Sequence, residues 1–272
     1  MGNLRFLYNN LWDTADLTAS SEVATLPVKN TVDPRLECKY RSISDSSTNV
    51  VANLGSAQAI TAVAIAGHNI SSSVTNLRLQ AHTSDSWGTP DVNINLLNPY
   101  GSYNTYNSGL ITWQGTLGTK RYWRILIEDA FNPDEYISLG RIFLGSYFEP
   151  IQDKDAYYTL KRLDLSEISM SLNGTKYVNQ KNKIWQIQCQ FPDVISDPSG
   201  IDDYQSFLNM FDNIGTNKDI FISINPDQVD LGANRYCDLQ RHTFYGKLLG
   251  GLEVIHNSGS YYQININFEE SI

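Results

Sequence analysis

The sequence contains few cysteines, and they form no recognisable pattern. Cys38, Cys189 and Cys237 are odd in number and far apart in a chain of 272 residues. Neither a disulfide framework nor a zinc-binding spacing follows from them. We therefore expect free thiols in a protein of a reducing compartment.

Charged residues are also scarce, at 18% of the chain, and the formal net charge is −9. Residues 1–148 hold 10 Lys and Arg against 12 Asp and Glu, whereas residues 149–272 hold 10 against 17. The basic residues stand singly or in short pairs such as Lys161-Arg162. Phosphate binding needs clustered cations, so we expect no nucleic-acid partner.

Long apolar runs are missing as well. No run approaches the roughly 20 residues that a membrane-spanning helix requires, and the first ten residues lack the apolar segment of a secretion signal. We expect a chain that is made as a soluble protein, with no membrane span.

Motifs for catalysis are absent from the sequence. There is no HExxH, GxSxG or phosphate-binding glycine loop. Four histidines stand at positions without metal-ligand spacing: His68, His82, His242 and His256. The sequence therefore predicts no enzyme, no cofactor and no metal site. A catalytic site formed by carboxylates that are far apart in the sequence but meet in space stays open.

The chain is rich in residues typical of strands and neutral turns. Asn, Ser, Thr, Tyr and Gly are plentiful, and 41% of residues are hydrophobic. Short apolar or alternating runs predict strands over 62–65, 76–81, 122–127 and 136–144. Residues 53–69 are interpreted as a turn, a buried strand and then the polar corner Gly67-His68-Asn69. The predicted fold class is all-β, and the corner is interpreted as structural, with a ligand hydroxyl as the alternative partner.

A change of pattern after residue 145 predicts two domains, 1–148 and 149–272. The second is expected to contain strands over 157–165, 168–172, 183–191, 219–225, 246–255 and 261–270. Asn173-Gly174 predicts a tight hairpin turn.

One helix is expected in the second domain, near 202–213. Tyr204, Phe207, Leu208 and Phe211 have the spacing of a single apolar face, which we interpret as core packing. Asp202 is expected near its N-terminus, and Gly215 is expected to end it in a left-handed turn.

Several short segments in the first 145 residues follow an order that resembles discoidin-type, galactose-binding-like jelly rolls. They are Leu17–Glu22, Tyr40–Ser42, Asn53–Ser56, Gly67–Asn69 and Arg121–Ile125. That family usually has a tryptophan where Tyr40 stands and an aspartate where Asn53 stands. The resemblance implies an N-terminal jelly-roll β-sandwich whose landmark segments serve the fold more than ligand chemistry.

The second half is similar to the ring-forming domain of tailed-phage distal tail and baseplate-hub proteins. The similarity rests on strands followed by one helix, on Asp219–Pro226, on the closing hairpin that ends at Phe268–Glu270, and on Leu139–Gly145 before Tyr147–Pro150. It implies a C-terminal β-sandwich or barrel that forms a homo-oligomeric ring, a trimer or a hexamer. Other tail proteins (tube, hub and fibre) would be partners in the virion, after synthesis in the host cytoplasm. Distal tail proteins commonly place the ring domain first, whereas here the jelly-roll-like half precedes it.

A long stretch with almost no charge, residues 84–118, is expected to be a contact loop. Its candidate contact residues are Trp87, Tyr100, Tyr103, Tyr106 and Trp113. Aromatic rings stack on sugars and also serve protein interfaces. A protein interface is favoured, and a saccharide-binding edge and a simple surface loop stay open.

Together these features predict a virion structural protein of a phage tail, whose ring joins the tail tube to tip or fibre proteins. The alternative is a carbohydrate-binding module that recognises a cell-surface glycan in host attachment. A polysaccharide hydrolase or lyase is the third hypothesis.

Overall fold

The computed structural model describes residues 4–96, 110–151, 157–197, 200, 202–224, 226, 239 and 242–271. The chain is mostly β, which confirms the predicted fold class. It separates into two compact units. Unit 1 consists of Met1–Glu149 with Phe221–Phe244, and unit 2 of Pro150–Ile220 with Tyr245–Ile272.

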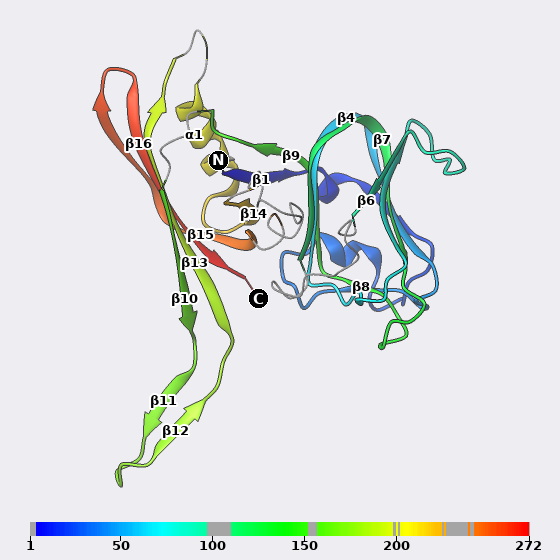
Figure 1. Cartoon of the computed structure of the whole chain (residues 1–272), viewed down its shortest axis with the longest axis horizontal. Coiled ribbons are helices and arrows are strands. Elements are labelled where there is room, and N and C mark those ends of the chain that lie inside the picture. Colours follow the sequence, from blue (N-terminus) through cyan, green and yellow to red (C-terminus); the bar gives the residue numbers. More distant parts are fainter. Residues whose placement is uncertain are drawn as a thin grey trace, which may run out of the picture. The chain divides into compact units, whose positions relative to one another are not determined.

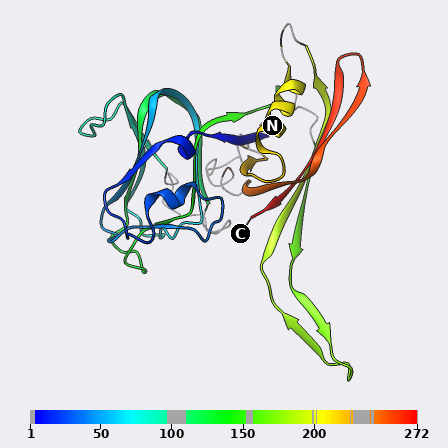
Figure 2. The ribbon, with the colours of Figure 1, turned by 180° about the vertical axis from the view of Figure 1, so that it is seen from behind.

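Unit 1 is a jelly-roll β-sandwich (Figures 1 and 2). Its strands are β1 (Arg5–Asn10), β2 (Asp16–Ala19), β3 (Tyr40–Arg41), β4 (Thr48–Ala66), β5 (Asn76–His82), β6 (Val92–Asn95), β7 (Leu110–Glu128), β8 (Ser138–Leu139) and β9 (Arg141–Phe148), with the 3-10 helices η1 (Leu11–Thr14) and η2 (Val28–Val32). The hydrogen-bonded order is β14-β1-β9-β4-β7-β5-β6, β2 pairs with β4, and β3 pairs with β8.

Segment 221–244 joins unit 1 because β14 (Asp219–Ser223) pairs with the first strand. Arg5 lies opposite Ser223, and Leu7 lies opposite Phe221. The sequence had assigned this segment to its second domain. The roles given to domains 1–148 and 149–272 stay predictions.

Strands β4 and β7 bend together over unit 1 (Figure 1). The first part of β4 pairs with β2, and its last part pairs with β9, while β7 accompanies both parts. The predicted turn at residues 53–56 is wrong, because β4 continues through it with a register irregularity between Asn53 and Gln58. Gly55 takes a φ of 75° there, which glycine adopts at low cost.

The core of unit 1 is built from alternate residues of these strands. Its largest fully buried side chains include Trp12, Tyr40 and Trp123. The indole N–H of Trp12 donates to Thr31 Oγ1 at 2.8 Å, so this buried polar group has a partner. The predicted strand over 136–144 divides into β8 and β9 at Gly140, where an added Cβ would lie 2.7 Å from the carbonyl oxygen of Ala66.

Unit 2 contains β10 (Tyr157–Asp164), β11 (Glu167–Met170), β12 (Lys176–Asn179), β13 (Lys183–Ile195), α1 (Asp203–Ile214), β15 (Thr243–Ser258) and β16 (Tyr261–Glu270). The first two residues of β15 fall in unit 1. The sheet order in unit 2 is β10-β13-β16-β15. In β16 Ile264, Ile266 and Phe268 are buried, as their alternation predicted.

A long hairpin extends from β10 and β13 (Figures 1 and 2). The β10–β13 ladder ends with Asp164 opposite Lys183, and β11 and β12 then pair from Glu167 and Asn179 onward. We call residues 165–182 the arm. The predicted hairpin is confirmed, but its turn is wider than expected: Ser171 N donates to Thr175 O at 2.9 Å, and Gly174 has a φ of 77° whereas Asn173 does not have a positive φ.

Helix α1 confirms the predicted helix, but its buried face differs from the predicted one. Phe207, Met210 and Ile214 are buried, and Leu208 is only half-buried. Tyr204 stacks on Tyr262 of β16 with ring centres 4.2 Å apart, which keeps it at the edge of the helix–sheet contact.

The two ends of α1 are set by residues that flank it. Asp202 caps the N-terminus by accepting from Gln205 N at 3.0 Å. Gly215 ends the helix with a φ of 54° and a ψ of −141°. Its positive φ was expected, but the ψ lies outside the predicted left-handed turn, in a region that is essentially restricted to glycine.

In the part of the chain that the structure describes, no helix has the length and apolar character of a bilayer span. Cys38 is half-buried and Cys189 is buried. Cys237 lies outside the described residues.

Candidate functional site

Polar side chains form a row on the outside of the β5–β6–β7 layer of unit 1. Leu77, Leu79 and Ala81 of β5 are buried in the core, so the residues between them project from the other side of the layer. Gln80 lies opposite Asn93 of β6 and opposite Arg124 of β7. We call the following set the outer face: Asn76, Arg78, Gln80, Asn93 and Arg124.

Hydrogen bonds connect the outer face from one strand to the next. Arg124 donates to Gln80 Oε1 from Nε at 2.9 Å and also from Nη2. Gln80 Nε2 donates to Asn93 Oδ1 at 3.3 Å. Arg78 Nη1 donates to the same oxygen at 3.2 Å, and Arg78 Nε donates to Asn76 Oδ1 at 2.8 Å. These bonds hold two guanidinium groups and three amides in fixed orientations.

Trp87 lies beside this row, in the segment between β5 and β6. The guanidinium carbon of Arg124 is 4.4 Å from the centre of its ring. The indole N–H donates to Asp85 Oδ1 at 2.8 Å. Trp87 is half-buried. Two interactions therefore fix an aromatic ring that retains exposed surface.

Burial is the main influence on the charge of Arg124. It lowers the pKa of the guanidinium, and the nearby charge of Asp85 acts in the opposite direction. Gln80, its hydrogen-bond partner, is 6% exposed. Arg124 is thus a partly desolvated cation that receives little compensation from carboxylates.

A second charged group lies where β5 ends and β6 begins, next to Lys120 of β7. Lys120 Nζ is 2.6 Å from Asp91 Oδ2, and His82 Nε2 is 3.9 Å from Asp91 Oδ1. The hydrogen bond from Lys120 lowers the pKa of Asp91. Lys120 and Asp91 balance each other, in contrast to the two arginines.

The structure describes two of the five predicted contact residues, Trp87 and Trp113. Trp87 borders the outer face, whereas Trp113 of β7 packs against the hydrophobic core of unit 1. Tyr100, Tyr103 and Tyr106 lie outside the described residues. The prediction of one loop over 84–118 is wrong, because β6 and the first part of β7 lie within that range.

Sequence reasoning did not single out Arg78, Gln80, Asn93 or Arg124. The available signal was the polar half of the β5 alternation, in which Asn76, Arg78, Gln80 and His82 stand at every second position. Their connection to Arg124 depends on the register of β5 against β7, which a single sequence does not reveal.

The His68-Asn69 corner has a structural role. Asn69 Nδ2 donates to Asp134 Oδ2 and to the carbonyl oxygen of Tyr136, each at 2.9 Å. Ser138 N donates to Asn69 Oδ1 at 2.7 Å. This amide therefore joins the end of β4 to the segment that leads into β8, as the structural interpretation requires.

The described residues contain no cluster of three or more His, Cys, Asp or Glu suited to a metal ion. The outer face offers hydrogen-bond donors, amide oxygens and one aromatic ring. These groups can bind a polar ligand.

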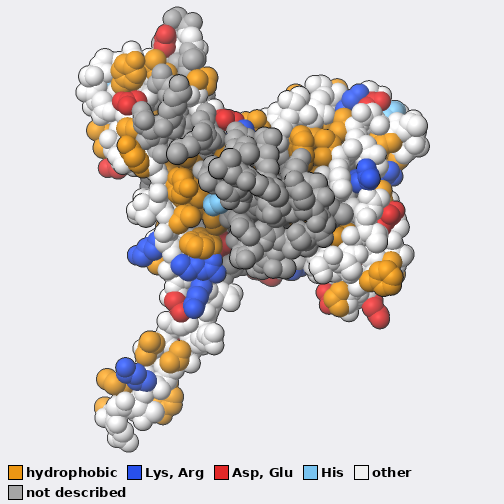
Figure 3. Space-filling model, viewed as in Figure 1, with side chains coloured by type: hydrophobic (Ala, Val, Ile, Leu, Met, Phe, Trp, Pro, Cys, Tyr) orange, Lys and Arg blue, Asp and Glu red, His pale blue; other side chains and the backbone are white. Residues whose placement is uncertain are grey.

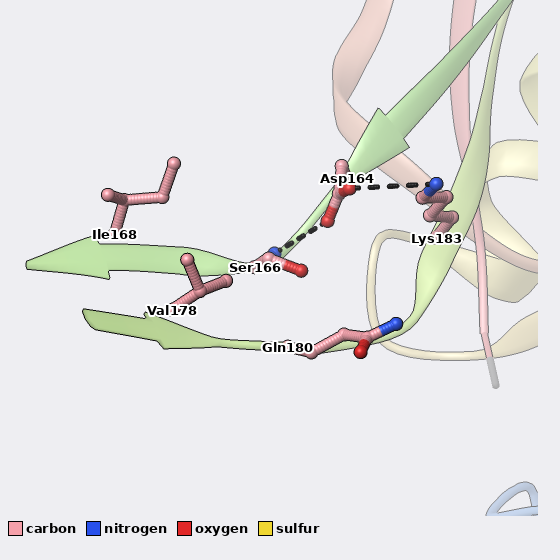
Figure 4. Close-up of a pocket in the computed structure, with 6 residues that line it drawn as sticks. All are labelled: Asp164, Ser166, Ile168, Val178, Gln180 and Lys183. Atoms are coloured by element: carbon pink, nitrogen blue, oxygen red, sulfur yellow. Dashed lines mark hydrogen bonds and ion pairs between the residues drawn. The ribbon is translucent and has the colours of Figure 1, made fainter. Parts of the chain in front are cut away.

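The arm presents a second distinctive surface, which is apolar. Ile168 and Val178 lie opposite each other and project to the same side of the hairpin (Figure 4). A notch of about 450 Å³ lies at the base of the arm, lined by Asp164, Ser166, Ile168, Val178, Gln180 and Lys183. Within it, Ser166 N donates to Asp164 Oδ1 at 2.9 Å, and Lys183 Nζ is 3.8 Å from Asp164 Oδ2.

Comparison with known proteins adds the following. No family model matches the chain, and neither does any curated protein. Half of the chain is similar to solved carbohydrate-binding modules. A chitosan-binding module of a chitosanase/glucanase from Paenibacillus sp. IK-5 is 21% identical, with a TM-score of 0.38 and coverage of 50% of this chain and 98% of the module.

Two further solved structures show the same extent of similarity. A module from Clostridium perfringens in complex with GalNAc-β-1,3-galactose is 12% identical, with a TM-score of 0.40 and coverage of 50% of this chain and 99% of that one. A fucose-binding module from Streptococcus pneumoniae is 13% identical, with a TM-score of 0.39 and coverage of 52% and 99%. None of these three is a phage tail or baseplate protein.

Proposed function

We propose that unit 1 is a carbohydrate-binding module and that the outer face with Trp87 is its binding surface. This is the alternative hypothesis from the sequence, with Trp87 retained and the five residues of the outer face added. The observation that supports it is an indole held in place beside a row of hydrogen-bonded amides and guanidinium groups.

The chemistry of this surface suits a sugar. A pyranose has apolar C–H faces, which stack on aromatic rings, and hydroxyls around its edge, which both donate and accept hydrogen bonds. Asn76, Gln80 and Asn93 have amide groups that can do both, and the arginines donate. Hydrogen bonds among these side chains already fix their orientations. Binding of a ligand therefore costs little side-chain entropy.

Calorimetry and glycan-array binding test this function with the full chain. Trp87→Ala removes the ring and is expected to lower affinity by tenfold or more. Phe131→Ala is the matched control, because its ring is 76% exposed on the same unit and is not part of the outer face. Equal affinity of wild type and Trp87→Ala, or no binding to any glycan, would contradict the proposal.

A second candidate function is assembly, because the arm exposes apolar side chains. Ile168, Met170 and Val178 share one face of the hairpin and are 69%, 67% and 63% exposed. Figure 3 shows the hydrophobic side chains (orange) and basic side chains (blue) along the arm. Exposed apolar surface of this kind is typical of a contact site.

The charge of this hairpin adds to the case for self-association. Residues 157–183 hold five Lys and Arg against two Asp and Glu, a net charge of +3, within a chain of net charge −9. The remaining residues of the chain therefore carry a net charge of −12, so a second copy attracts the basic hairpin electrostatically. In this candidate function the chain forms a ring in a phage tail and joins the tube to tip or fibre proteins.

Light scattering behind size exclusion tests assembly over a range of concentrations. The wild-type chain is expected to form a discrete oligomer, and the double variant Ile168→Ser with Val178→Ser is expected to be monomeric. Tyr177→Ser alters the other face of the same hairpin and serves as the control. A wild-type chain that is monomeric at every concentration would contradict self-assembly.

A further inference from the structure

We infer that the outer face selects an acidic saccharide, in which a carboxylate or sulfate group binds between Arg78 and Arg124. This inference rests on the carbohydrate-binding function proposed above and names the class of its ligand.

The first argument concerns charge compensation. The hydrogen-bond acceptors of Arg78 and Arg124 on the outer face are neutral amide oxygens of Asn76, Gln80 and Asn93. Among the described residues, neither guanidinium forms an ion pair. Arg5 and Arg141 of the same unit differ, since Arg5 binds Glu149 at 2.7 Å and Arg141 binds Asp13 at 2.6 Å.

Spare donors are the second argument. A guanidinium has five N–H groups. Arg124 uses two of them on Gln80, and Arg78 uses one on Asn76 and one on Asn93. Three N–H groups on each arginine thus have no acceptor on the outer face. A carboxylate or sulfate takes such groups in pairs, and charge-assisted bonds are about twice as strong as neutral ones.

The strand register brings the two arginines close together. Gln80 lies opposite Arg124, and Arg78 lies opposite Leu126, so Arg78 and Arg124 are diagonal neighbours on one side of the layer. Diagonal neighbours have backbone positions roughly 7–8 Å apart, within the combined reach of two long side chains. One oxyanion can therefore contact both guanidinium groups.

Nearby carboxylates do not remove this preference. Asp85 is the acidic group that interacts with Arg124, and its Oδ1 accepts the indole N–H of Trp87. Asp91 is paired with Lys120. Glu128 also borders the outer face, where its Oε2 accepts from Asn76 Nδ2 at 3.2 Å. The two arginines therefore favour an anionic ligand through their unused N–H groups rather than through an excess of positive charge.

The side chain of Gln80 provides a sharp test. In Gln80→Glu, a carboxylate of nearly the same size would accept the two bonds from Arg124 and neutralise it. This variant is expected to keep the fold and to lose the preference for acidic glycans. Arg124→Gln and Arg78→Gln are expected to lower affinity for acidic glycans by tenfold or more, as loss of hydrogen bonds to a charged group implies.

Arg121→Gln is the matched control. Arg121 lies on the same strand and also donates to an amide, Asn53 Oδ1 at 2.9 Å, but strand alternation places it on the other side of β7. The variant Arg121→Gln removes the same charge from the chain as Arg124→Gln. The affinity of Arg121→Gln for acidic glycans is therefore expected to stay within twofold of wild type.

The experiment is binding of the full chain to an array of neutral, uronic-acid, sialylated and sulfated glycans, at 50 and 300 mM NaCl, with circular dichroism to check the fold of each variant. Preference for acidic glycans that weakens with salt and disappears in Gln80→Glu supports the inference, and the carboxylated and sulfated sets distinguish the two anions. Binding to neutral glycans alone overturns the inference and leaves the carbohydrate-binding function intact. Binding to no glycan overturns that function as well.

Discussion

Arg124 lies between Trp87 and Gln80: its guanidinium carbon is 4.4 Å from the centre of the indole ring, and its Nε is 2.9 Å from Gln80 Oε1. One side chain thereby joins a residue outside the strands to the surface of the sheet. A cation over an aromatic face contributes about 0.5–1 kcal/mol at an exposed site and more when desolvated. The orientation of Trp87 thus depends on a residue of β7.

The first prediction concerns Arg124→Ala. Gln80 is nearly buried, and its amide oxygen would lose both hydrogen bonds from Arg124, while Trp87 would lose its cation. We expect the free energy of unfolding of the chain to fall by about 1–3 kcal/mol in urea titrations followed by circular dichroism. Arg35→Ala, at an exposed arginine paired with Asp33, is the control and should have little effect. Equal losses in both variants would contradict the role given to Arg124.

The second prediction concerns pH. Burial, and then the charge of Lys39, lower the pKa of His68 from 6.5 to about 3, and Ile70 N donates to the ring Nδ1 at 3.1 Å. In this window the unfolded chain binds a proton that the folded chain does not, so stability falls as the pH decreases from 6.5 toward 3. His68→Gln has no such proton.

The stability of wild type relative to His68→Gln should therefore decrease with falling pH, by at most about 1.4 kcal/mol per pH unit. Urea unfolding at pH 7.0, 5.5 and 4.5 measures the difference. Curves for the two proteins that run parallel across this range would show that His68 is not held in its neutral form.

The third prediction compares two glycines of β15. A Cβ at Gly246 would overlap the backbone carbonyl oxygen of Glu269, whereas a Cβ at Gly251 would meet nothing within 4 Å. Gly246→Ala must displace backbone of β16, so we expect a loss of about 2 kcal/mol or more. Gly251→Ala should stay within about 0.5 kcal/mol of wild type. Thermal and urea unfolding distinguish them, and similar values would contradict the close approach of the two strands.

The fourth prediction tests which face of α1 is buried. Phe207 is fully buried, and its ring centre lies 4.9 Å from that of Phe191, whereas Leu208 is half-buried. Phe207→Ala should cost about 3–5 kcal/mol of stability, and Leu208→Ala much less. A loss in Leu208→Ala as large as that in Phe207→Ala would favour the face predicted from sequence spacing, which contains both residues.

Local patterns in the sequence predicted much of the fold. The alternation of buried and exposed residues in β5 and β16 is visible in the sequence, and so are the turn after β11 and the caps of α1. The residues at which strands begin and end were harder to predict from the sequence. Residues 53–56 have the composition of a turn, but pairing of β4 with β2 and β7 on both sides carries the strand through them.

The binding surface was less predictable for the same reason. Trp87 stood out because it is aromatic in a polar segment. Gln80 and Arg124 are 44 residues apart, and their contact depends on strand register. Trp113 looked equivalent to Trp87 in the sequence, yet its strand turns it onto the core. Chemistry that is assembled across strands becomes visible only when the pairing is known.

The pairing of β1 with β14 sets an order of events during synthesis of the chain. Arg5 of β1 lies opposite Ser223 of β14, which is far along the chain. The ribosome therefore releases β1 long before it has made the strand that pairs with one edge of β1. Until then that edge carries unpaired backbone groups, which are open to pairing with other chains. Phe6 and Leu7, which are buried in the folded protein, lie on β1 and are also exposed during this time. A nascent chain stalled before residue 219 should therefore be more prone to aggregation than the finished protein.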